Sequence, residues 1–220
     1  MTKITQTAQK AVTFLSLAFL LTALSGCSIA GNSGVEEAKY TTVNSAADQN
    51  IEVRTYKSMV LVSTEMPKGE RNDAFRRLFD YITGANIKQS DIAMTAPVLM
   101  NEAKQGENIS MTAPVFMNES KGTPVMSFVM PDSFTLSSTP KPTNPKVWVH
   151  EKTNYQVAAI TFSGTLSDSN VNEHTQKLTQ WLTKNGYQAI GKPVEAAYNG
   201  PLTLPWYRKN EVLIEVKPVL

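Results

Sequence analysis

Residues 92–120 read IAMTAPVLMNEAKQGENISMTAPVFMNES and nearly repeat themselves. The eleven residues 92–102 return, with two changes, as residues 109–119. In each copy a two-residue period places an isoleucine, two methionines, an alanine and a valine on the same face. The repeat therefore predicts two strands with matching apolar faces, joined by the polar loop 101–108.

Each copy contains one proline, Pro97 or Pro114, which has no N–H to donate to a sheet. We therefore expect both strands to be interrupted, or to lie at an edge, near these prolines. Six of the nine methionines fall between Met94 and Met130. They can pack an irregular core or line a pliable surface, form an adaptable pocket for a flat apolar ligand, or ligate a soft metal or haem iron. The five-residue gaps within each copy, with no histidine nearby, argue against copper.

Two amphipathic helices flank this region. The spacing i, i+3, i+4, i+7 predicts a helix over residues 73–83 whose apolar face holds Phe75, Leu78, Phe79 and Ile82. Asn72 or Asp73 can cap its start, and Gly84 can end it. A second helix is predicted over residues 168–184, ended by Gly186.

The order of predicted elements occurs twice. Strands are expected first over residues 40–43, 51–56, 58–65 and 125–130, and later over 147–151, 156–162 and 211–216. Residues 147–151 and 156–162 have the spacing of a hairpin. Because strands and helices do not alternate one for one, an antiparallel sheet is favoured. We predict an α+β domain of two similar halves, each placing one helix on a shared curved sheet.

The first 26 residues are typical of a signal peptide. Lys3 and Lys10 precede an uncharged run over residues 11–23, which is short for a membrane span. Leu24-Ser25-Gly26-Cys27 then resembles a bacterial lipobox, in which the cysteine is acylated and becomes the new N-terminus. We therefore predict a lipoprotein signal peptide over 1–26, a lipid-anchored tether over 27–35, and a domain over 36–220.

This processing would leave a domain without a cysteine and with balanced charge. Cys27 is the only cysteine, so the domain would have no disulfide, cysteine nucleophile or cysteine-ligated metal. Without the two signal-peptide lysines, basic and acidic residues number 19 each. No basic run suggests nucleic-acid binding. We expect the protein in the bacterial cell envelope on the periplasmic side, with Ser28 compatible with sorting to the outer membrane.

Several motifs along the domain occur together in one known family. They are Glu36-Glu-Ala-Lys-Tyr40, Ile51-Glu-Val-Arg-Thr-Tyr56, the doubled Ile-x-Met-Thr-Ala-Pro-Val, Met126-Ser-Phe-Val-Met-Pro131, Tyr198-Asn-Gly-Pro-Leu-Thr-Leu-Pro205 and Arg208-Lys-Asn-Glu-Val212. In this order the chain resembles the SOUL haem-binding family from about residue 36 to its C-terminus. The resemblance implies a distorted antiparallel β-barrel flanked by two helices, with pseudo-twofold symmetry. The implied fold is also similar to that of ligand-binding domains of some bacterial effector-sensing regulators.

The resemblance also implies a tetrapyrrole site between the first helix and the loop before the last strand. On this chain the candidate apolar contacts are Phe75, Phe79, Leu202, Leu204 and Trp206. The candidate partners of propionate carboxylates are Arg76, Arg77, Arg208 and Lys209. The plainer alternative is that both phenylalanines belong to the core and that Arg76 and Arg77 lie on a solvated face.

Two histidines are the candidates for axial ligation of haem iron. His174 lies on the apolar face of the second helix and is more typical of a partly buried structural histidine. His150 lies beside Glu151, and this position suggests that the two side chains pair at the surface. Since no histidine lies near the first helix, we expect haem, if bound, to have no firm axial ligand from the protein.

No catalytic constellation is recognised, and we expect no enzymatic activity. The leading hypothesis is a membrane-tethered carrier, buffer or sensor of haem or a related tetrapyrrole. Two alternatives remain: a structural or protein-interaction lipoprotein without haem affinity, and an effector-type pocket for another amphipathic small molecule.

Overall fold

Six antiparallel strands close into a barrel. The computed structural model describes residues 34–88, 106–120 and 122–219. Around the barrel the strands run β3 (Ile51–Glu65), β9 (Val147–Phe162), β12 (Asn210–Pro218), β11 (Val194–Ala197), β6 (Val115–Ser120) and β7 (Thr123–Val129), which returns to β3. Strand β2 (Thr41–Ala46) extends β3, and β10 (Tyr187–Ala189) extends β12. The predicted α+β fold and β-barrel are confirmed.

Short elements complete the chain. Strand β1 (Glu36–Glu37) pairs in parallel with β5 (Thr112–Ala113), and β4 (Asn86–Ile87) pairs with β8 (Lys141–Pro142). The 3-10 helices η1 (Ala47–Gln49) and η2 (Pro205–Tyr207) lie before β3 and β12. Among the described residues, all strands and α-helices lie within residues 36–218, so a chain beginning at Ser28 keeps these elements.

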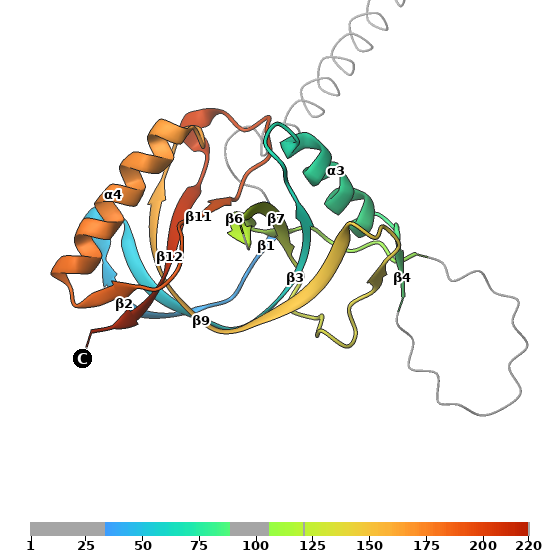
Figure 1. Ribbon diagram of the computed structural model, residues 1–220, viewed down its shortest axis with the longest axis horizontal. Coiled ribbons are helices and arrows are strands. Elements are labelled where there is room, and N and C mark those ends of the chain that lie inside the picture. Colours follow the sequence, from blue (N-terminus) through green and yellow to red (C-terminus); the bar gives the residue numbers. More distant parts are fainter. Residues whose placement is uncertain (1–33, 89–105, 121, 220) are drawn as a thin grey trace, which may run out of the picture.

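Helices α3 (Arg71–Ile82) and α4 (Asp168–Lys184) lie outside the barrel, each after one of the two long strands β3 and β9. Figure 1 shows them over opposite ends of these curved strands. This repeat of a long strand and a helix is the predicted pseudo-twofold symmetry. Helix α4 has the predicted bounds, with Ser167 accepting from the backbone of Asn170 at its start. Helix α3 begins two residues earlier than predicted, at Arg71, and its N-cap residue Glu70 makes no side-chain cap hydrogen bond.

Two strand predictions are wrong in the same way. Residues 51–56 and 58–65 form one strand, β3, and the expected hairpin of residues 147–151 and 156–162 is the single strand β9. The two strands pair along almost their whole length, from Ile51 opposite Ile160 to Thr64 opposite Val147. Between the two predicted strands, Asn154 has a positive φ of 49°. It makes a local irregularity in a continuous strand instead of a reversal.

The inward face of both long strands changes parity at this irregularity. On β9, Tyr155, Val157 and Ala159 belong to the cluster inside the barrel, whereas Ala158 and Ile160 pack under α4. Before Asn154 the odd-numbered residues Val147 and Val149 point outward and pack under α3, whereas after it the odd-numbered residues point into the barrel. On β3 the inward residues change from Tyr56 to Met59 and Leu61. One irregular position thus lets each strand serve both halves of the molecule.

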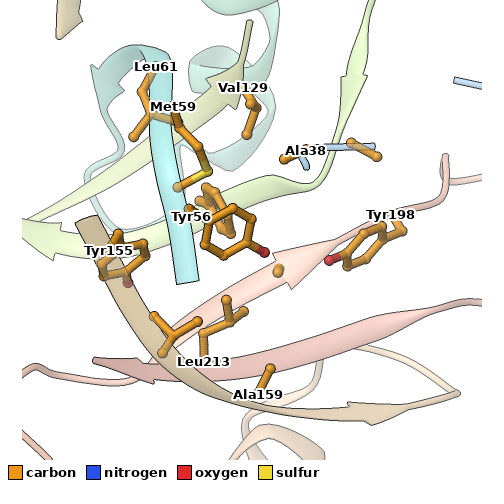
Figure 2. Close-up of a cluster of buried hydrophobic side chains, with 13 residues drawn as sticks. Ala38, Tyr56, Met59, Leu61, Val129, Tyr155, Ala159, Tyr198 and Leu213 are labelled. Atoms are coloured by element: carbon orange, nitrogen blue, oxygen red, sulfur yellow. The ribbon is translucent and has the colours of Figure 1, made fainter. Parts of the chain in front are cut away.

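Three apolar clusters form the core. One fills the barrel and includes Tyr56, Met59, Leu61, Tyr155, Tyr198 and Leu213, whose side chains converge in Figure 2. The second lies under α3 around Leu78 and Tyr81, and the third under α4 around Leu178 and Trp181. Burial of these faces, at about 25 cal/mol per Å² of apolar surface, holds both helices on the barrel.

The second copy of the methionine repeat follows the prediction except at Ala113, which belongs to the cluster inside the barrel instead of the shared face. Its strand is interrupted at Pro114, between β5 and β6. Met111, Val115 and Met117 face the α3 side, whereas Phe116 points into the barrel. The first copy, residues 92–102, lies outside the described residues, as does Cys27.

Candidate functional site: an apolar cleft beside helix α3

A cavity of about 730 Å³ opens between the start of α3 and the loop that joins β11 to β12. This volume falls within the range of small-molecule and cofactor sites. Its apolar wall comprises Val35, Phe75, Met111, Ala113, Val115, Met117, Met126, Leu166, Ala197, Pro201 and Leu202. The repeat therefore supplies much of one wall, as the hypothesis of a pliable methionine pocket expects.

The loop beside the cleft is ordered by its own hydrogen bonds. Arg208 donates from Nε to the carbonyl of Thr203 at 2.8 Å and from Nη2 to the carbonyl of Pro201 at 2.9 Å. The backbone N–H of Lys209 donates to Oδ1 of Asn199 at 2.7 Å. Gly164, in the loop before α4, donates to the carbonyl of Pro205 at 2.8 Å. The cleft wall is thus a pinned loop and not a loose connection.

Two guanidinium groups lie in the cleft lining. Arg71 reaches the sulfur of Met117 at 2.6 Å and lies 3.9 Å from the carboxylate of Glu195. Burial, the largest influence, raises the pKa of Glu195, and Arg71 partly opposes that effect. Arg208 forms its side-chain bonds with backbone carbonyls, and within the described residues it has no carboxylate partner. Its charge is therefore available to an anionic group of a ligand.

Three of the nine predicted contact residues line the cavity: Phe75, Leu202 and Arg208. Phe75 is 38% exposed, so the expectation that it belongs to the core is wrong. Leu202 is 82% exposed. A hydrophobic side chain held open at a cleft is what a ligand site requires.

Six predicted residues lie outside the cavity lining. They are Arg76, Arg77, Phe79, Leu204, Trp206 and Lys209. Phe79 is 44% exposed and stacks on Phe75 at a centroid distance of 6.1 Å. Arg76 pairs with Asp73, and Lys209 pairs with Glu37 at 2.8 Å. Arg77 is not solvated as expected, because it is half-buried and donates to Thr64 and Glu65.

The two histidines lie away from this cleft. His174 stacks on Phe162 at 4.1 Å, and its Nδ1 lies 2.7 Å from the carbonyl of Asn170. It is the partly buried structural histidine that its position on α4 predicts. His150 points toward the barrel interior, and Glu151 instead accepts from Ser58 at 2.6 Å. The expected surface pairing of His150 with Glu151 is therefore wrong.

Sequence reasoning missed several cleft residues, including Arg71, Thr112, Leu166, Ala197 and Asn210. Thr112 is informative because its Oγ1 is buried and has no hydrogen-bond partner. These residues could have been found by combining two signals: the apolar face of the repeat, and closure of the barrel, which brings β11 against β6. No group of three or more metal-ligating His, Cys, Asp or Glu side chains occurs among residues 34–88, 106–120 and 122–219.

The profile of the SOUL heme-binding protein family matches residues 35–106 and 99–215, nearly the whole described domain. The chain belongs to the SOUL heme-binding protein family. This is a family of binding proteins, and membership points to haem or another tetrapyrrole as the class of ligand. No curated protein sequence matches the chain.

Solved structures share the fold at low identity. The C-terminal domain of EcmrR is 14% identical, with a TM-score of 0.51 over 82% of this chain and 99% of its own. A hydrolase from Listeria innocua is also 14% identical, with a TM-score of 0.51 over 77% of this chain and 92% of its own. An uncharacterized conserved protein from Listeria innocua is 15% identical, with a TM-score of 0.51 over 77% and 93%. At these identities the likeness concerns the fold alone.

Proposed function

We propose that the protein binds haem or a related tetrapyrrole in the cleft beside α3, as a membrane-tethered carrier, buffer or sensor. The observation that carries the proposal is an amphipathic cleft of about 730 Å³ at the place that the family resemblance implies. Its methionine and phenylalanine wall suits the face of a macrocycle, and Arg208 suits a propionate at the rim.

The residues of the cleft fit a tetrapyrrole better than a tightly ligated iron. The lining contains three thioethers, from Met111, Met117 and Met126, and no imidazole. The phenol of Tyr198 is turned away, since it donates to Glu211 at 2.7 Å inside the barrel. Bound haem would supply redox or gas-binding chemistry, while the chain holds and orients the macrocycle.

A haemin titration tests the proposal. With the chain beginning at Ser28, we expect a saturable Soret change with a Kd below about 10 µM, or about 7 kcal/mol of binding free energy. Phe75→Ala should weaken binding at least tenfold, because it removes the aromatic wall. Phe79→Ala is the matched control, one turn away and similarly exposed but outside the lining, and should stay within threefold.

Metal-free protoporphyrin separates recognition of the macrocycle from ligation of the metal. If the cleft recognises the macrocycle, it should bind with an affinity close to that of haemin, and His174→Ala should leave the haemin spectrum unchanged. The absence of saturation by either compound, or equal affinity in Phe75→Ala, would refute the proposed function.

The tether is proposed from the sequence around Cys27. Among the described residues no helix is long and apolar enough to cross a membrane. We propose acylation of Cys27 and a periplasmic, outer-membrane location. Strand β1, which follows the proposed tether in the sequence, pairs with β5. Cys27→Ser should move the protein from the membrane to the soluble fraction after cell lysis. Retention of the variant on membranes would contradict acylation.

A further inference from the structure

A second cavity, of about 320 Å³, lies at one end of the barrel interior. Strands β6 and β7 separate it from the cleft beside α3. Phe116 and Ser127 face the barrel cavity, whereas Met117 and Met126 face the cleft. The two spaces therefore lie on opposite faces of the same two strands.

The walls of this cavity are aromatic and polar. Phe116, Trp148 and Tyr155 line it, together with the polar side chains of Asn118, His150 and Lys152. Trp148, His150 and Lys152 point the same way because they alternate along β9. The volume is at the low end of the range for small-molecule sites, which limits an occupant to about one or two rings.

Two polar atoms at this cavity are buried without a partner. They are Oδ1 of Asn118 and Nδ1 of His150. A buried polar group without a hydrogen bond destabilises the fold, so this end of the barrel is polar for a reason other than packing. Oδ1 can only accept, so it requires a donor on the occupant.

The charge at the cavity favours an anion over a cation. Lys152 lies 3.4 Å from a carboxylate oxygen of Glu215, and its ammonium lies 3.4 Å over the ring of Tyr155. Burial lowers the pKa of His150, with Lys152 as the second cause, and both effects favour the neutral imidazole. A cationic ligand would be repelled by the ammonium of Lys152, whereas a ligand carboxylate would give this ammonium a second anionic partner.

From this geometry we propose that the barrel end is a second ligand site for a small aromatic carboxylic acid that also carries an O–H or N–H donor. The ring packs among Phe116, Trp148 and Tyr155. The carboxylate pairs with Lys152 and accepts from His150, and the donor reaches Oδ1 of Asn118. This site is independent of tetrapyrrole binding in the cleft.

Tryptophan fluorescence can test the site directly. In a chain beginning at Ser28 with Trp206→Phe, the remaining tryptophans are Trp148, at the cavity, and Trp181, buried under α4. Titration with 4-hydroxybenzoate or indole-3-carboxylate should give a saturable change with a Kd below 1 mM. The absence of saturation up to 5 mM with both probes would overturn the proposal.

Variants should separate the contributions of charge and hydrogen bonding. Asn118→Leu and His150→Leu should each weaken binding at least tenfold, whereas His150→Asn should stay within threefold because it keeps a polar atom near Nδ1. Lys152→Met should weaken the acid probes tenfold but leave phenol and indole, which lack the carboxylate, unchanged. Unaltered affinities in the first two variants would place the probes elsewhere and overturn the proposal.

Phe75→Ala separates this site from the cleft. It should leave the affinity for both acids unchanged while weakening haemin, so each site can fail alone. Loss of acid binding in Phe75→Ala would assign the probes to the cleft and refute a barrel site. If Asn118→Leu fails to fold by circular dichroism, amide NMR shifts in the unaltered chain decide: perturbations must centre on residues 116–118, 127 and 148–152.

Discussion

One buried cation organises the end of the barrel opposite the second cavity. Arg54 is 0% exposed and donates to Glu52 at 2.8 Å, to both carboxylate oxygens of Glu211 and to the hydroxyl of Tyr198. Its guanidinium also lies 4.3 Å from the ring centroid of Tyr40. Burial, the largest single influence, lowers the pKa of Arg54, but Glu211, Tyr56 and Tyr198 together more than compensate, so the pKa lies above its ordinary value. Arg54 is thus held as a charged group inside the protein.

Removing this cation should be costly. Arg54→Met leaves Glu211 buried and unpaired, and we expect a loss of about 3–5 kcal/mol in the free energy of unfolding. The measurement is unfolding in urea followed by circular dichroism, because guanidinium could itself enter the vacated space. Arg76→Ala, an exposed arginine paired only with Asp73, should change the free energy by less than about 0.5 kcal/mol.

The partner substitution provides a further check. In Arg54→Met with Glu211→Leu, no unpaired charge remains, and most of the lost stability should return. If Arg54→Met alone costs less than about 1 kcal/mol, the guanidinium does not neutralise a buried Glu211, and this interpretation of the barrel interior is wrong.

At this scale the sequence predicted the site only in part. Phe75, Leu202 and Arg208 could be chosen because residue type and family position agree. Arg71 and Thr112 could not, since they enter the cleft through the start of α3 and the interruption at Pro114. His150 points inward because its face of β9 lines the barrel. Periodicity alone could not predict which face points inward, since the parity changes at Asn154.

At the scale of elements, helices were predicted better than long strands. The 3.6-residue pattern of α4 and its flanking Ser167 and Gly186 fix both of its ends. In β9 a polar Thr-Asn pair interrupts the apolar alternation and resembles a turn. Whether such a pair reverses the chain or only changes its parity is decided by β3, whose residues pair with both sides of Asn154. That information is tertiary.

The conformation of Asn154 gives a test of this interpretation. Its φ of 49° is left-handed, where glycine and asparagine are tolerated and β-branched residues are strained. We expect Asn154→Gly to change the free energy of unfolding by less than about 0.5 kcal/mol, and Asn154→Val to cost about 1–2 kcal/mol. Thermal or urea unfolding of the two variants is the measurement. Equal stability of the two variants would show that the backbone relaxes there and that parity does not depend on a left-handed residue.

At the scale of the whole molecule, the two halves exchange core residues. Val147 and Val149 of the second half pack under α3 of the first, while Ile51 and Val53 of the first half pack under α4 of the second. The barrel closes through two seams between the halves, β3 with β9 and β6 with β11. The pseudo-twofold pattern was readable from the order of elements, but this exchange was not, because it depends on strands that span both halves.

The exchange predicts that neither half is a folding unit. Cutting the chain between the exposed residues Ser137 and Ser138 gives residues 28–137 and 138–220, each with an open sheet and a helix lacking part of its core. Alone, neither fragment should show a cooperative thermal transition by circular dichroism. An equimolar mixture should recover one, because pairing restores both seams and both helix clusters at once. A second fragment carrying Val157→Asp, which places a charge at a fully buried barrel position, should not reconstitute. Cooperative unfolding of either fragment alone would show that the repeat folds as two domains and would contradict a single interlocked barrel.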